Sequence, residues 1–168
     1  MLWIIMGVAG SGKSTIGTRL SQRTGWLFYE GDNCHPPENV EKMSRGIPLN
    51  DEDRLPWLLA LRDLIDEVLS NQSHAIIACS ALKAAYRELL QGEHKEIFWV
   101  YLKGDYAQIW SRMQQRQGHF MKAQMLRSQF ETLEEPEKAL TVSIAESPEV
   151  IVNQIVNYLE ILKNQSND

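Results

Sequence analysis

An octapeptide close to the amino terminus has the residue types and the spacing of a phosphate cradle. Residues 7–14 read GVAGSGKS and fit the pattern G-x-x-x-x-G-K-[ST], between an apolar run and a helical pattern. Glycines let successive backbone N–H groups turn toward phosphate oxygens, and the positive end of the following helix attracts the same charge. The alternative is a glycine-rich turn without a ligand, but such a turn does not require the Lys-Ser pair that follows the glycines. The segment therefore predicts a site for a nucleoside triphosphate.

Two residues of this cradle have specific expected roles. Lys13 is expected to reach the β- and γ-phosphates as a catalytic cation, and the Ser14 hydroxyl is the expected ligand of Mg²⁺. The chain has neither the N-K-x-D element with which GTPases read guanine nor the apolar strand ending in Asp-Glu of ATPase motors. A small kinase that uses ATP is therefore favoured. The predicted nucleotide contacts in the cradle are Gly7, Ala9, Gly10, Ser11, Gly12, Lys13, Ser14 and Thr15.

A carboxylate follows the second apolar segment of the chain. Asp32 lies two residues beyond Glu30, and it is the carboxylate best placed to accept a proton from a substrate hydroxyl. An aspartate that caps the Gly-Asp-Asn turn is the alternative. The adjacent Cys34 and His35 do not predict a metal site, because two neighbouring ligand types without partners cannot build a tetrahedral centre. Asp32 is thus predicted to be catalytic.

A cation stands in the first turn of the long helix that residues 48–57 introduce. The three acids at 51–53 suit this turn, where the helix dipole favours negative charge. Arg54 is electrostatically misplaced there unless it faces an anion such as a substrate carboxylate. An ion pair with a neighbouring acid is the alternative. Arg54 is predicted to bind substrate.

Residues 106–130 contain five basic side chains and no acid, although the whole chain is acidic. This bias suits a lid at about 112–130 that closes over phosphates. Arg112 and Arg116 are spaced to share one helix face, so both guanidinium groups are expected to point toward the nucleotide, with Arg116 contacting the transferring oxygens. Gly118 would allow a bend, with His119 near the tip. A solvated basic face is the alternative.

Short apolar segments that alternate with helical patterns must position these side chains. The predicted strands cover residues 2–6, 26–30, 75–79, 97–102 and 139–144. A helix is expected over 13–23, and two apolar stripes at helical spacing are Leu58, Leu61, Ile65, Val68 and Ile151, Ile155, Leu159, Leu162. The alternation predicts an α/β fold with a five-stranded parallel sheet, helices on both faces, and ligands beyond the carboxyl ends of the strands. One domain is expected over 1–163, followed by a polar tail at 164–168.

Composition excludes several classes of protein. The chain has 168 residues, 43% of them hydrophobic and 23% charged, which is typical of one globular domain. A formal net charge of −5 argues against capture of nucleic acid or of an anionic membrane. No apolar run is long enough to span a membrane, and the two cysteines are too few for a disulfide framework. A cytoplasmic protein without nucleic-acid or membrane partners is expected.

Motifs along most of the chain resemble the short-chain gluconokinases. The resemblance covers about residues 4–136, with Ala9 where many members have serine. It implies a P-loop nucleoside triphosphate hydrolase fold of the nucleoside-monophosphate-kinase type, and the phosphorylation of D-gluconate to 6-phosphogluconate with ATP and Mg²⁺ in a cytoplasmic enzyme that is often a homodimer. The matching segments are 7–14, 31–32, 35–37, 41–44, 51–54, 79–83, 86–87, 101–104, 118–120, 128–130 and 133–136.

The resemblance also implies an acceptor site. Asp32, His35, Arg54, Lys83 and His119 are the residues expected to contact gluconate, with Lys83 beside Arg54 at the carboxylate and hydroxyls. For Lys83, a solvated helix start is the alternative. Two alternatives stay open on the residues alone. One is a related small kinase for shikimate or a nucleoside monophosphate, and the other is a non-catalytic ATP-binding switch.

Overall fold

Each of the five segments predicted to be strands forms a strand of one parallel sheet. The computed structural model of the chain describes residues 1–116 and 123–165. Its sheet has the strand order β2-β3-β1-β4-β5, and each neighbouring pair is parallel. The predicted five-stranded sheet is confirmed. The strands are β1 (Leu2–Met6), β2 (Leu27–Glu30), β3 (Ala75–Ala78), β4 (Ile97–Lys103) and β5 (Leu140–Ser143).

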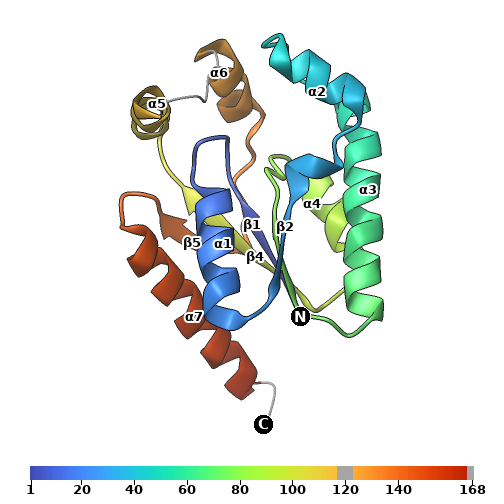
Figure 1. Cartoon of the computed structure of the whole chain (residues 1–168), viewed down its shortest axis with the longest axis vertical. Helices are drawn as coiled ribbons and strands as arrows, with labels where there is room; N and C mark the ends of the chain where they lie inside the picture. Colours follow the sequence, from blue (N-terminus) through green and yellow to red (C-terminus); the bar gives the residue numbers. More distant parts are fainter. Residues whose placement is uncertain (117–122, 166–168) are drawn as a thin grey trace.

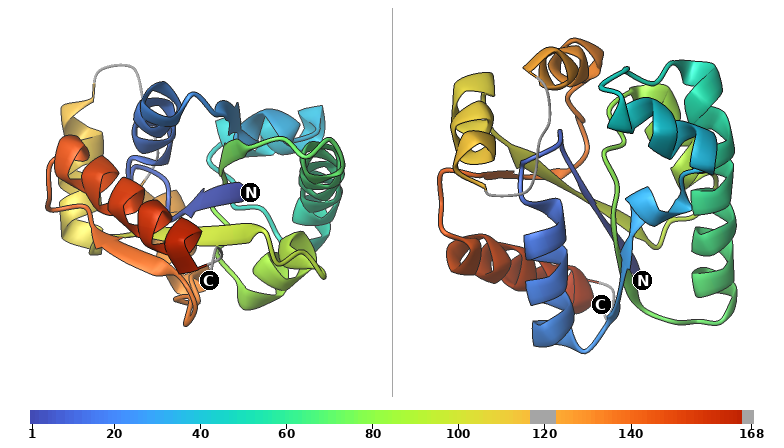
Figure 2. Two further views of the ribbon diagram at one scale, coloured as in Figure 1. Left: turned by 90° about the horizontal axis from the view of Figure 1, so that it is seen from below. Right: turned by 45° about the horizontal axis from the view of Figure 1, so that its top comes forward.

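Helices cover both faces of this sheet, as Figures 1 and 2 show. One face is covered by α1 (Lys13–Thr24) and α7 (Pro148–Gln165), and the other by α3 (Asp51–Ser70) and α4 (Ala84–Gln91). Because β1 lies at the centre, all of its five residues are buried, which explains why its sequence is apolar without alternation.

The side chains of β1 divide the core into two halves. Trp3 and Ile5 pack with α1 and α7, whereas Leu2, Ile4 and Met6 pack with α3 and α4. The apolar stripe of Leu58, Leu61, Ile65 and Val68 is buried in the second half, as its spacing predicts. The sheet is therefore fixed from both sides.

Four further elements lie beyond the carboxyl ends of the strands, at the top of Figure 1. They are the short 3₁₀ helix η1 (Gly31–Cys34), α2 (Pro37–Ser44), α5 (Tyr106–Gln115) and α6 (Ala123–Thr132). The expected lid at 112–130 includes the end of α5 and most of α6, while its tip residue His119 lies outside the described residues. The edge of the sheet that should bind ligands thus carries the irregular part of the chain.

Two helix ends differ from simple spacing. α7 continues to Gln165, so its last two residues overlap the polar tail expected at 164–168. Arg112 and Arg116 were expected on one helix face, but α5 ends at Gln115 and Arg116 has an extended backbone with φ −82° and ψ 118°. The two guanidinium groups therefore do not share a helical face.

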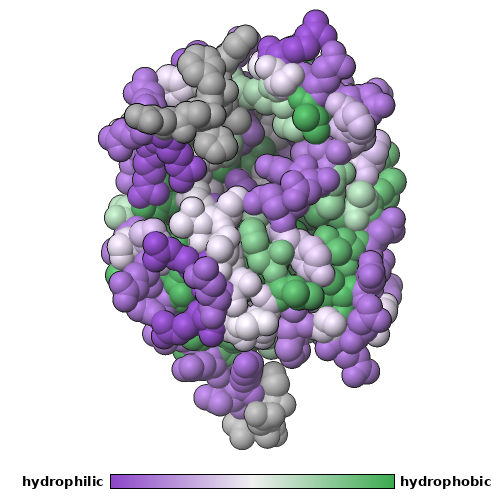
Figure 3. All heavy atoms as spheres, viewed as in Figure 1, coloured by the Kyte–Doolittle hydropathy of each residue, from purple (hydrophilic) through white to green (hydrophobic). Residues whose placement is uncertain are grey.

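The surface is mixed in polarity, as Figure 3 shows. Hydrophobic residues gather over the edge strand β2 and over α3, where Leu27, Leu55 and Leu59 are exposed. Among the helices of residues 1–116 and 123–165, none is long and apolar enough to cross a membrane.

Candidate active site

The cradle between β1 and α1 depends on backbone conformations that favour glycine. Gly7, Gly10 and Gly12 have φ angles of 151°, 77° and 99°. A Cβ atom at Gly7 would lie 2.7 Å from Ser11 Oγ and 3.0 Å from the carbonyl oxygen of Leu102, which leaves no room for a side chain. These backbone angles explain why the three positions are glycine, and they give the loop the turned backbone that the sequence predicts. Within the loop, the Ser11 N–H donates to the Val8 carbonyl at 3.2 Å.

Lys13 crosses over this loop. Its Nζ donates to the carbonyl oxygens of Gly7 and Val8, each at 3.0 Å. Burial lowers the pKa of Lys13, while the nearby Asp32 and Glu30 carboxylates favour the charged form. The amine is thus held at the mouth of the loop, where an incoming phosphate can take over its hydrogen bonds.

Ser14 contacts a carboxylate that was not among the site residues predicted from the sequence. The Ser14 hydroxyl donates to Glu30 at the end of β2. A hydroxyl and a carboxylate are both hard oxygen ligands, which Mg²⁺ prefers, and Mg²⁺ usually takes only one or two protein groups beside substrate phosphates. This pair therefore fits a magnesium site. The position of Glu30, one residue before Gly31-Asp32 at a strand end, was the signal that could have found it.

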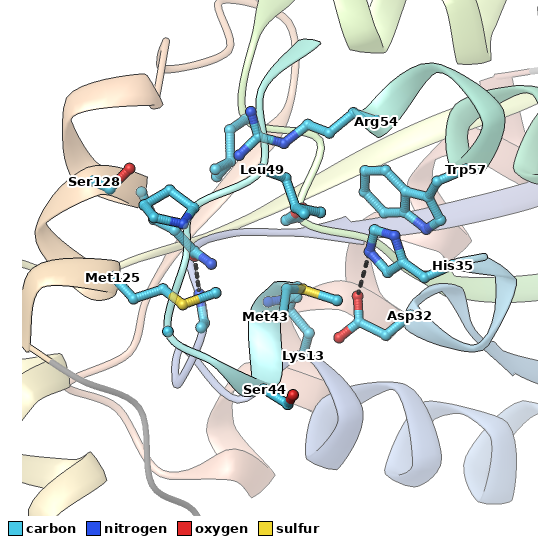
Figure 4. Close-up of a pocket in the computed structure, with 16 residues that line it drawn as sticks. Lys13, Asp32, His35, Met43, Ser44, Leu49, Arg54, Trp57, Met125 and Ser128 are labelled. Atoms are coloured by element: carbon cyan, nitrogen blue, oxygen red, sulfur yellow. Dashed lines mark hydrogen bonds and ion pairs between the residues drawn. The ribbon is translucent and has the colours of Figure 1, made fainter. Parts of the chain in front are cut away.

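A cavity of about 220 Å³ opens beside the cradle. This volume is below the roughly 300–1,000 Å³ of sites for drug-sized ligands, so it suits a small molecule. Figure 4 shows Lys13 and Asp32 facing the cavity from one side and Arg54 from another, with Met125 and Ser128 of α6 completing the wall. The structure thus brings Lys13, Asp32, His35 and Arg54 together around one space.

Asp32 and His35 form one corner of the cavity. The Asp32 side chain is 67% exposed, and its Oδ1 lies 3.9 Å from His35 Nε2. The His35 ring is only 4% exposed and stacks on Trp57 with 4.3 Å between the ring centroids. Trp57 in turn donates its indole N–H to the Gly31 carbonyl at 2.8 Å. A rigid aromatic pair therefore supports a carboxylate that stays accessible to a substrate.

Arg54 reaches the cavity from the first turn of α3, which begins with a capping box formed by Asn50 and Asp53. Its Nη1 donates to the Tyr86 hydroxyl at 3.1 Å, and its guanidinium lies 5.6 Å from the centre of that ring. Among the ion pairs of the described residues, none involves Arg54. Side-chain hydrogen bonds lower the pKa values of Asp51 and Asp53, and the charge of Arg54 lowers them further, so it also acts on the neighbouring acids. Tyr86 donates to Asp51, and burial with this bond raises the pKa of Tyr86.

Some predicted site residues lie elsewhere. Lys83 does not line the cavity; its Nζ lies 2.9 Å from Asp51 Oδ1, and this hydrogen bond raises the pKa of Lys83. The Arg112 guanidinium donates to the carbonyl of Ile144. Arg116 and Thr15 are exposed outside the cavity, and His119 lies outside the described residues.

Other residues were missed by the sequence predictions. Gln129 of α6 lines the cavity and accepts the Ala9 N–H at 2.7 Å. Asn39 of α2 is 3% exposed and contacts His35. The only sequence signal for Gln129 was its place in a matching segment, residues 128–130, and Asn39 had no signal, because its partner is defined by the tertiary packing of α2.

Known proteins resemble this chain over nearly its full length. A family model described as shikimate kinase matches residues 9–160. A gluconokinase from Gluconobacter oxydans is 43% identical over 94% of this chain and 90% of its own length. Among solved structures, a gluconokinase from Sinorhizobium meliloti has a TM-score of 0.86 and 40% identity, covering 98% of this chain and 96% of that one.

More distant structures share the fold alone. A shikimate kinase from Aquifex aeolicus superimposes with a TM-score of 0.57 at 20% identity, covering 95% of this chain and 96% of that one. The family model and the curated relatives thus carry different names. The identity of 43% over almost the whole chain weighs more for the acceptor than a family-wide model does.

Proposed function

This chain belongs to the shikimate kinase family and, by its relatives, to the gluconokinases, and from that premise we propose how its own residues carry out the reaction. The enzyme phosphorylates D-gluconate to 6-phosphogluconate. We propose that ATP is the donor, that its phosphates occupy the cradle of residues 7–14, and that the sugar acid occupies the adjacent cavity. The observation that carries this assignment is that Lys13 of the cradle also lines the cavity together with Asp32 and Arg54.

The transfer requires one bond to form and one to break. The terminal hydroxyl oxygen of gluconate attacks the γ-phosphorus, its proton passes to the Asp32 carboxylate, and the bond to the departing ADP oxygen breaks. Lys13 stabilises the charge that develops on the phosphate oxygens. Asp32 is suited to its role because it is accessible, lines the same cavity as Lys13 and favours the charged form of that amine.

We propose that Ser14 and Glu30 hold the Mg²⁺ that accompanies the nucleotide. When bound, Mg²⁺ neutralises charge on the phosphates. The Ser14 hydroxyl and the Glu30 carboxylate are already in contact, so both oxygens are available at one place.

A coupled assay with a panel of acceptors tests the function. The purified enzyme and ATP are offered gluconate, shikimate, glycerate and a nucleoside monophosphate, and ADP release is measured. Gluconate should be preferred by the ratio of kcat/KM. A preference for shikimate would assign the chain to the other kinase chemistry of its family, and nucleotide binding without turnover would identify a switch.

Replacing Glu30 by glutamine is expected to weaken Mg²⁺ binding. The amide keeps the size of the side chain but loses the negative charge that favours a hard cation. Titration of activity with Mg²⁺ should show a half-saturation concentration raised by about tenfold, the scale seen when groups that support a metal site are changed. Glu67→Gln, an exposed change on α3, is the control. An unchanged Mg²⁺ titration would remove Glu30 from the site.

Arg54 is proposed to bind the carboxylate of the sugar acid. Arg54→Leu should raise the KM for gluconate by about 10- to 150-fold, because a charge-assisted hydrogen bond contributes about 1.5–3 kcal/mol. The KM for ATP should change little. Arg23→Leu, on the exposed end of α1, is the matched control. An equal rise in KM for gluconate and for ATP would mean that Arg54 binds the nucleotide or has a structural role.

The remaining assignments concern the lid, the assembly and the compartment. We propose that residues 112–130 act as a lid over the nucleotide, in which Arg112 and Arg116 move toward the phosphates when ATP is bound.

The exposed apolar residues Leu27, Leu55 and Leu59 support a homodimer. The family resemblance supports a cytoplasmic location. Light scattering of the purified protein tests the assembly.

A further inference from the structure

A buried asparagine contacts the histidine of the active site. Asn39 of α2 is 3% exposed, and its Nδ2 lies 2.7 Å from the backbone carbonyl oxygen of Asp53 and 3.1 Å from His35 Nδ1. A carbonyl oxygen can only accept a hydrogen bond, so the atom facing Asp53 must be the amide nitrogen. This contact fixes which way the Asn39 amide points.

The fixed amide determines which nitrogen of the neutral His35 ring carries the hydrogen. An amide nitrogen has two hydrogens and no acceptor capacity, so His35 Nδ1 must accept from it. A proton on Nδ1 would face an N–H group across 3.1 Å. The neutral ring consequently carries its proton on Nε2. Burial and the charge of Arg54 lower the pKa of His35, against the opposing effect of Asp32, and so favour the same neutral form.

The protonated Nε2 is directed toward the catalytic carboxylate. It lies 3.9 Å from Asp32 Oδ1, which is too long for a direct hydrogen bond. An oxygen placed about 2.8 Å from each of these atoms fits between them. Stacking on Trp57 keeps the ring from turning away. The corner therefore offers one donor and one acceptor to the same hydroxyl (Figure 4).

We propose that Asn39 is a positioning residue that holds His35 in the Nε2–H tautomer, so that His35 donates to the attacking hydroxyl while Asp32 accepts its proton. This inference rests on the proposed function of the cavity. The hydroxyl needs both partners, because the donor aims its oxygen and the acceptor removes its hydrogen. A polyol hydroxyl is the group of gluconate that can serve both at once.

The tautomer can be measured on the unmodified enzyme. Uniformly ¹⁵N-labelled protein at neutral pH gives a distinct ring pattern for each histidine in a long-range ¹H–¹⁵N correlation spectrum. His35 should show an unprotonated Nδ1 and a protonated Nε2. The signal is assigned by its loss in His35→Gln, with His94→Gln, outside the cavity, as the matched control. A protonated Nδ1 at neutral pH would overturn the proposal.

A double-mutant cycle tests whether the tautomer affects catalysis. Asn39→Ala removes the donor, so the neutral ring can carry its proton on either nitrogen, and kcat should fall by about threefold to tenfold, the scale of one hydrogen bond. The KM for ATP should not change. The His35→Gln background has no ring tautomer, so there Asn39→Ala should cost less than about twofold more.

The cycle separates positioning from simple support of the fold. Equal losses in both backgrounds would make Asn39 a structural residue and overturn the proposal. If Asn39→Ala does not fold, the spectrum of the unmodified enzyme still decides the tautomer. A failure of the gluconate assay would overturn the proposed function and, with it, the role of His35 toward the hydroxyl, whereas the tautomer is read without turnover, so the two failures are distinguishable.

Discussion

Lys13→Ala is expected to lower kcat by at least about 10²–10³-fold, the loss that follows removal of one preorganised group at developing charge. Lys13 is the cation of the cradle, and its Nζ is bonded only to the loop carbonyls of Gly7 and Val8 in the hydrogen bonds described. Water can replace the amine at those carbonyls at the mouth of the cavity. The fold should survive, and thermal unfolding should show a small change in Tm.

The measurement is 6-phosphogluconate formation at saturating ATP and gluconate. Lys95→Ala removes an exposed lysine before β4, at the opposite edge of the sheet, and should keep full activity. Full activity of Lys13→Ala would remove the cradle from the mechanism, whatever the affinity for ATP.

Asp32→Asn is expected to lower kcat by about 10²–10⁴-fold, the usual contribution of a positioned general base. The amide can still orient the substrate hydroxyl, but it cannot take its proton. Because the side chain is 67% exposed, the substitution should leave the core unchanged. Binding of ATP should be kept, and binding of gluconate should weaken only modestly.

Single-turnover measurements separate the chemical step from binding. Asp63→Asn, an exposed change on α3, is the matched control. A loss of less than about threefold in kcat would make Asp32 a turn residue, and the proton would then leave by another route.

The sheet could be predicted because its signals are local. Each strand is a short apolar segment that ends in a turn, and no end of an observed strand differs from the predicted end by more than one residue. β2, for example, begins at Leu27 instead of Trp26. The end of a helix is harder to predict. α5 stops before Arg116, although residues 112 and 116 have helical spacing, because spacing alone does not reveal where a backbone leaves the helix.

In the candidate site, too, local features could be predicted from the sequence and long-range contacts could not. The cradle is contiguous in sequence, so its pattern alone predicts it. The partner of Arg54 is Tyr86, 32 positions away, and the partner of Ala9 is Gln129, 120 positions away. Such contacts form only when the helices and strands pack together, so the sequence alone does not reveal them. Lys83 shows the reverse case: it is predicted to contact the substrate, whereas in the structure its Nζ lies 2.9 Å from Asp51 Oδ1, and its substrate contact stays a prediction.

The two halves of the active site are encoded by separate stretches of chain. The cradle comes from the β1–α1 connection, whereas much of the acceptor cavity comes from α2, the start of α3 and α6. Mutations in the acceptor segments can therefore alter which hydroxyl compound is recognised while the phosphate chemistry is inherited intact. This separation marks residues 37–54, which supply much of the cavity lining, as the stretch to randomise when a new acceptor is sought.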